Sequence, residues 1–108
     1  MKLVIAIVQD EDVSKLIDEL TTKEFRVTKL ASTGGFLKSG NTTLLIGVEE
    51  SKLSNVMGII EDICTTREIT TAMPSMPMTQ DTYVPYPYQI KIGGATIFIL
   101  DVERYERI

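Results

Sequence analysis

A glycine-rich segment with the sequence TGGFLKSGN occupies residues 33–41 and carries the strongest chemical signal in the chain. The adjacent Gly34 and Gly35 allow positive φ, so that consecutive backbone N–H groups can converge on an anion or approach a flat base. Asn41 offers a donor and an acceptor, which match the edge of an adenine, and Arg26 carries a fork of donors suited to phosphate. These residue types fit two interpretations equally: a site for a small anionic ligand, and a long β-hairpin loop with turn glycines.

Other motifs carry less chemistry. The glycine segment fits neither G-x-G-x-x-G nor the Gly-Lys-Ser/Thr ending of a P-loop. Phe36 and Leu37 follow its glycines directly, a poor place for an exposed apolar pair unless something packs on them. Acidic clusters at 10–12 and 49–50 could act as metal ligands or acid–base groups, but each opens a predicted helix, where dipole effects account for it.

The composition narrows the function classes. Fifteen acidic and eleven basic residues give a net charge of −4, which argues against a long nucleic acid as partner. The absence of histidine excludes His-based triads and most zinc sites, so a binding protein is favoured over an enzyme. A single cysteine, Cys64, suits a reducing cytoplasm. The apolar run at 3–8 is far shorter than the roughly 20 residues that span a bilayer, so neither a membrane nor a secretory segment is expected.

Hydrophobic periodicity predicts the elements that position these residues. Strands are expected at 2–9, 25–31 and 42–48, the first of them apolar on both faces. A helix capped by Asp10 or Asp12 follows the first strand, and a second helix is capped by Ser51. The helical stripes are Val13, Leu16, Ile17 and Leu20 in the first and Leu53, Val56, Met57, Ile60, Ile63 and Cys64 in the second.

The stretch 66–88 differs in character, because it holds all four prolines, three methionines and three tyrosines. Residues 68–72 could pair as an edge strand, and the rest predicts a long loop that either docks a partner or packs on a neighbouring copy. Strands at 89–92 and 95–101 flank Gly93-Gly94, which predicts a two-residue hairpin turn. A final helical turn is expected within 102–108.

Together these elements predict an α+β sandwich of the ferredoxin-like βαββαβ kind, with an extra C-terminal β-hairpin. Two short helices cover one face of the sheet, yet the strands at 2–9 and 95–100 are apolar on both faces. Self-association through the uncovered face, most simply in a closed ring, resolves this conflict. The number of subunits stays open at this point.

Four segments closely resemble the PII-like cyclic di-AMP receptor proteins: KLVIAIVQD, FRVTKLASTGGFLKSGNTTLLIGV, YVPYP and GGATIFILDV. The resemblance runs nearly end to end and implies a single PII-like domain over 1–108. It further implies cytoplasmic homotrimers that bind cyclic di-AMP at clefts between subunits, with no cofactor and no catalytic activity. The family has a short ligand loop, here 33–41, and a long mobile loop, here 66–88.

The same resemblance assigns site residues. Arg26 and Thr28 would meet the phosphate and the ribose, and Gly47 would allow close approach at the pocket floor. Asn41 would hydrogen-bond a base. Further pocket residues implied by the family are Gly35, Phe36 and Leu37 around one adenine, Phe98 near the second adenine, Arg107 in the C-terminal segment, and Lys38 as part of a general positive field.

Three other functions are compatible with the residues. The protein could be a PII-like sensor of ATP or another nucleotide, a phosphodiesterase of cyclic dinucleotides, or a structural ring without a ligand. For the receptor, the hypothesis is that ligand binding orders 33–41 and biases 66–88, which exposes or hides a surface for an unidentified protein partner.

Overall fold

The computed structural model describes the backbone of residues 1–30, 40–73 and 86–108, and the side chains of 1–30, 40–70 and 89–108. Within these ranges, no helix has both the length and the apolar character needed to cross a membrane. The elements in chain order are β1 (Lys2–Gln9), α1 (Asp10–Thr22), β2 (Arg26–Leu30), β3 (Asn41–Val48), a short 3-10 turn (Glu50–Lys52), α2 (Leu53–Cys64), β4 (Arg67–Met73), β5 (Tyr86–Ile92) and β6 (Ala95–Asp101).

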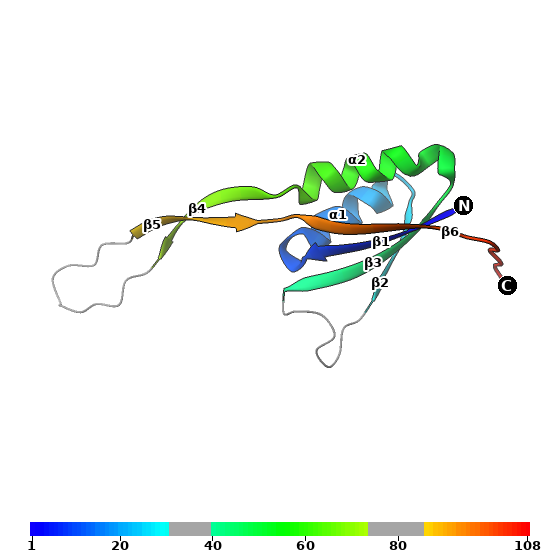
Figure 1. Ribbon diagram of the computed structural model, residues 1–108, viewed down its shortest axis with the longest axis horizontal. Coiled ribbons are helices and arrows are strands. Elements are labelled where there is room, and N and C mark those ends of the chain that lie inside the picture. The colour runs from blue at the N-terminus through cyan, green and yellow to red at the C-terminus, as the bar shows by residue number, and fades with distance from the viewer. Residues whose placement is uncertain (31–39, 74–85) are drawn as a thin grey trace.

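Four strands form one antiparallel sheet in the order β2-β3-β1-β6. Helices α1 and α2 lie side by side on one face of this sheet (Figure 1). With β6 as the last strand, the succession β1-α1-β2-β3-α2-β6 is ferredoxin-like, so the predicted fold class is confirmed. The prediction took 68–72 as the fourth strand and 95–101 as part of an extra hairpin, and this assignment is wrong. β4 lies outside the main sheet, and β6 is its fourth strand beside β1. None of the described residues places a helix on the opposite face of the sheet, and we call it the open face.

Alternation along the strands builds the core between the sheet and the helices. Val4, Ala6 and Val8 of β1 are at most 1% exposed, whereas the residues between them point to the open face and are half-buried. Leu44 and Ile46 of β3 are fully buried in the same way. The predicted stripes of both helices meet them, including Leu16, Leu20, Val56, Ile60 and Cys64, which are all at most 2% exposed.

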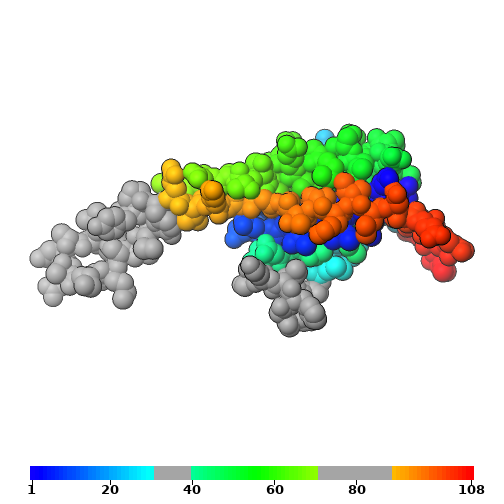
Figure 2. Space-filling model, in the orientation of Figure 1, coloured from blue at the N-terminus to red at the C-terminus, as the bar shows by residue number. Residues whose placement is uncertain are grey.

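Strands β4 and β5 form a separate two-stranded ribbon, which we call the arm. Their pairing runs from Arg67 opposite Ile92 to Met73 opposite Tyr86. The arm extends away from the four-stranded sheet, beyond the end of α2 (Figures 1 and 2). The strand predicted to start at 89 begins earlier, at Tyr86, and so includes Pro87. A two-stranded ribbon tolerates this proline because each of its strands has a free edge.

The predicted C-terminal hairpin across Gly93-Gly94 is wrong. β5 pairs with β4, while β6 pairs with β1 over seven residues. Both glycines do have positive φ, of 87° and 93°, but they redirect the chain from the arm into the main sheet. A Cβ on Gly93 would lie 2.5 Å from the carbonyl oxygen of Thr65, so this crossing needs glycine for close approach as well as for its backbone angle.

The helix starts also differ from the prediction. Helix α1 begins at Asp10 after Gln9, and no side chain caps it, because Asp10 and Asp12 bind other partners described below. Ser51 lies inside the 3-10 turn, and α2 begins at Leu53. Residues 102–108 contain no helical turn. For α1, contacts to distant residues therefore take the place of a local cap.

Candidate functional site

The open face carries several of the predicted ligand residues in two rows across the sheet. The pairing register aligns Arg26, Gly47, Leu3 and Leu100 in one row and Thr28, Leu45, Ile5 and Phe98 in the next. Side chains in one row share a face because antiparallel partners point the same way. Arg26 and Thr28 therefore stand on the same side of the sheet as Gly47.

A pocket of about 730 Å³ lies at the β2 end of this face. It brings together three of the predicted residues, Arg26, Thr28 and Gly47. Its other walls come from the start of β1, the α1–β2 turn, the end of β3, the 3-10 turn and the C-terminal segment: Met1, Leu3, Lys23, Glu24, Phe25, Leu45, Val48, Glu49, Lys52, Val102 and Tyr105.

The turn between α1 and β2 presents a charged edge to this pocket. The N–H of Glu24 donates to the carbonyl of Thr21, and the N–H of Phe25 donates to that of Leu20, each at 2.9 Å. This closes the helix as a Schellman motif with Glu24 at φ +67°, where glycine is usual. The turn thereby places Lys23 and Glu24 in the pocket wall beside Arg26.

Basic side chains outnumber acidic ones around the pocket, although the protein as a whole is acidic. Lys23, Arg26 and Lys52 face Glu24 and Glu49 in its walls. The terminal ammonium of Met1 lies 3.8 Å from Glu49, so one carboxylate already has a cationic partner. Within the part of the chain that the structure describes, Arg26 forms no ion pair. Its guanidinium is therefore free to bind an anion, preferably in a fork-shaped contact.

Gly47 leaves space that its own chain does not fill. A Cβ at this position would meet nothing closer than the sulfur of Met1, at 3.9 Å, and the residue is exposed. Folding of a single copy therefore does not need glycine here. A ligand or a neighbouring copy that approaches the backbone of β3 would need it.

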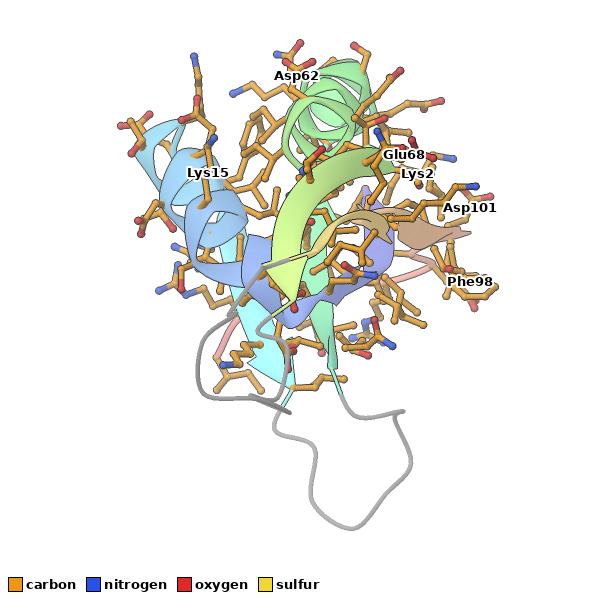
Figure 3. The ribbon with its side chains drawn as sticks, turned by 90° about the vertical axis from the view of Figure 1, so that its left-hand side faces the viewer. Lys2, Lys15, Asp62, Glu68, Phe98 and Asp101 are labelled. Atoms are coloured by element: carbon orange, nitrogen blue, oxygen red, sulfur yellow. The ribbon has the colours of Figure 1, made fainter. Side chains whose placement is uncertain are left out.

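The other predicted site residues lie elsewhere. Asn41 starts β3 and lines a different hollow, of about 360 Å³, with Gln9, Gly93 and Gly94. Phe98 is 51% exposed and projects from β6 on the side away from the helices (Figure 3). Its strand is separated from β2 by three strand spacings, about 14 Å. Arg107 is exposed in the C-terminal segment and does not line the pocket.

Gly35, Phe36, Leu37 and Lys38 lie outside the described residues. The pocket adds three residues that sequence reasoning missed as ligand candidates: Lys23, Lys52 and Tyr105. In the sequence, Lys23 is distinguished only as a cation near the end of a predicted helix, where it suits the helix dipole. Tyr105 is the one tyrosine outside the proline-rich stretch 66–88, and this isolated position could have indicated that the C-terminal segment lines the pocket.

Metal binding has little geometric support in this part of the chain. Among residues 1–30, 40–73 and 86–108, no three His, Cys, Asp or Glu side chains are grouped so as to hold a metal ion. Three carboxylates of the two acidic clusters have other partners: Asp10 accepts a hydrogen bond from Thr42, Asp12 pairs with Arg67, and Glu49 lies beside the terminal ammonium of Met1.

The fold and the pocket define a ferredoxin-like α+β domain that offers cations and an open sheet face to a small ligand. The model of the cyclic-di-AMP receptor family matches residues 1–108, and the chain belongs to this family. The match confirms the family identified from the sequence motifs.

A solved structure supports the same fold. It is described as the crystal structure of a functionally unknown protein from Pediococcus pentosaceus ATCC 25745. The two chains are 44% identical, the TM-score is 0.78, and the match covers 99% of this chain and 96% of that chain.

Proposed function

We propose that this protein is a non-enzymatic cytoplasmic receptor that binds cyclic di-AMP at the interfaces of a homotrimer and signals its level through the arm. The observation that carries the proposal is the match of the whole chain to the cyclic-di-AMP receptor family. The cation-lined pocket with Arg26 supports it, because a dianion bound by an acidic protein needs a local concentration of positive charge.

The positions of Thr28 and Phe98 support a site shared between copies. They occupy one row of the open face but stand at its two edges, β2 and β6, too far apart to hold one adenine between them. If the β6 edge of one copy faces the β2 edge of the next, both side chains reach one ligand. Contacts between two different surfaces of this kind close into a ring.

The apolar character of the open face favours the same assembly. Phe98 and Leu100 are 51% and 49% exposed in a single copy, and Leu3, Ile5 and Ile7 beside them are only half-buried. Burial of such a surface stabilises association by about 25 cal/mol per Å² of apolar area. A ring of copies therefore removes from water the apolar face that two helices leave uncovered.

In this site Arg26 binds a phosphate, Thr28 contacts the ribose, and Gly47 lets the ligand approach the floor. Phe98 of a second copy packs on one adenine, and Asn41 hydrogen-bonds a base. Gly35, Phe36 and Leu37 complete the pocket from the glycine-rich segment, and Arg107 adds charge from the tail. No cofactor takes part. The arm changes when cyclic di-AMP binds, and a protein partner recognises that change.

Calorimetric titration tests the proposal. We expect cyclic di-AMP to bind more tightly than cyclic di-GMP or ATP, and Arg26→Ala to weaken its binding by about 1–3 kcal/mol. Lys29→Ala is the matched control, because Lys29 is a cation on the same strand but points to the other face. It should leave the affinity within about twofold.

Sedimentation of the same samples should give a trimer. A monomer at micromolar concentration, or a ring that ignores cyclic di-AMP, would contradict the proposal. Tighter binding of ATP would instead make the protein a general nucleotide sensor. Formation of linear dinucleotide with Mg²⁺ or Mn²⁺ would make it a phosphodiesterase.

A further inference from the structure

The last residue of β1 and the first three residues of α1, residues 9–12, change the direction of the chain, and we call them the β1–α1 turn. This turn holds the start of β3 in place. The backbone N–H of Asp10 donates to the carbonyl of Gly40 at 2.8 Å, and the Thr42 hydroxyl donates to the Asp10 carboxylate at 2.5 Å. Gln9 pairs with Asn41 in the sheet register. Asn41, the proposed base-binding residue, is therefore fixed on both sides by Asp10 and from across the sheet by Gln9.

The same turn holds the first strand of the arm. The Asp12 carboxylate accepts hydrogen bonds from both terminal nitrogens of Arg67, at 2.6 and 3.4 Å. The Asp12 side chain is only 5% exposed. The hydrogen bond to Asp12 favours the charged guanidinium of Arg67 and raises its pKa. Arg67 also donates to the carbonyls of Ile63 and Thr65, which ties the end of α2 to the first residue of β4.

The turn also holds the second strand of the arm. The N–H of Gly93 donates to the side-chain oxygen of Gln9 at 2.7 Å, at the point where β5 passes into β6. The N–H of Gly94 donates to the carbonyl of Cys64. Asn41, Gln9, Gly93 and Gly94 line one hollow, so the proposed ligand residue lies directly beside the base of the arm.

We propose that residues 9–12 couple ligand occupancy at Asn41 to the position of the arm, with Gln9 and Asp12 as positioning residues for its two strands. Gln9, Asp10 and Asp12 lie within four residues of one another and together contact both regions, so a shift of Asn41 moves groups that also hold Arg67 and Gly93. A ligand changes the arm to the extent that it favours one arrangement of these contacts. This inference rests on the proposed function.

Hydrogen exchange measured with and without saturating cyclic di-AMP tests the coupling. In the unaltered protein, we expect the ligand to change amide exchange at 67–73 and 86–94 by about tenfold. Asp12→Asn removes the ion pair, and Gln9→Met removes the acceptor for Gly93. In either variant, saturated according to its own titration, the change in the arm should fall to about threefold or less.

Asp101→Asn is the matched control. It breaks the ion pair between Lys2 and Asp101, which joins the start of β1 to the end of β6, at the end of the sheet far from the arm (Figure 1). Its ligand response should equal that of the unaltered protein. Circular dichroism shows whether each variant is folded, and the two arm variants are independent, so one misfolded variant leaves the other decisive.

The outcomes separate the two proposals. If cyclic di-AMP does not bind the unaltered protein, the proposed function fails and the coupling fails with it. If cyclic di-AMP binds but exchange in the arm does not change, binding stands, whereas signalling through the arm and the coupling both fail. If the arm responds and Gln9→Met and Asp12→Asn keep the full response, the proposed function stands and only the coupling through residues 9–12 is wrong.

Discussion

The two faces of the four-stranded sheet are similarly apolar in sequence but have opposite fates in the structure. On the helix side, Val4, Ala6 and Leu44 are fully buried within one copy. On the open face, Phe98 and Leu100 remain about half exposed. The difference arises because both helices, of 13 and 12 residues, pack on the same face of the sheet, so neither covers the other face.

This contrast separates the residues that stabilise a copy from those that serve its function. The covered face holds the contiguous core cluster, which determines whether one chain folds. The open face holds the pocket with Arg26, Thr28 and Gly47, and the apolar surface proposed to meet other copies. Substitutions on the two faces should therefore affect different measurements.

Leu44→Ala should have the largest effect on stability. Leu44 is fully buried on the covered face, and loss of its side chain leaves a cavity beneath the helices, so the free energy of unfolding should fall by about 2–5 kcal/mol. Urea denaturation followed by circular dichroism measures the loss. A loss below about 1 kcal/mol would show that the covered face is not the main source of stability.

Gly47→Ala should instead act on binding. A methyl group has room within one copy, so the free energy of unfolding should stay the same or rise by up to about 1 kcal/mol, because glycine weakens a strand. The same methyl group would crowd a ligand at the pocket floor, and cyclic di-AMP binding should weaken by about 1–3 kcal/mol. Unchanged affinity in titration would show that no ligand approaches β3 closely at this position.

Phe98→Ala compared with Ile99→Ala gives a finer test of the two faces. These neighbours on β6 are similarly exposed in one copy, at 51% and 43%, but point to opposite faces. Phe98→Ala should weaken cyclic di-AMP binding by about 1 kcal/mol through lost contact with an adenine. Ile99→Ala should leave the affinity unchanged. Equal effects of the two substitutions on binding would remove Phe98 from the proposed site.

Cys64 should show the smallest effect at neutral pH. Burial on the covered side raises the pKa of its thiol from 9.0 to about 11, so the folded protein holds this proton more tightly than the unfolded chain. Stability should therefore be insensitive to this group below pH 9 and should decrease as the pH rises towards 11. Cys64→Ala should flatten this decrease in denaturation curves. An equally steep decrease in the variant would assign it to other groups.

The sequence by itself predicted two helices, strands at 2–9, 25–31, 42–48 and 95–101, and Arg26 as a candidate ligand for phosphate, and the structure contains these elements. Periods of 3.6 and 2 report the burial of near neighbours, and the residue type sets what a side chain can bind. The same periodicity also predicted an uncovered apolar face. The family match confirmed the motif-based identification over residues 1–108.

Only the tertiary structure decided which strands pair at the C-terminal end and where the acidic residues of α1 act. Gly93-Gly94 has the local character of a hairpin turn, but β6 gains a full ladder with β1, and β5 gains one with β4. Asp12 has the local character of a helix cap, yet it binds Arg67, 55 residues away. Such choices depend on competition between distant partners, which local sequence patterns do not record, because each candidate contact satisfies the same local rule.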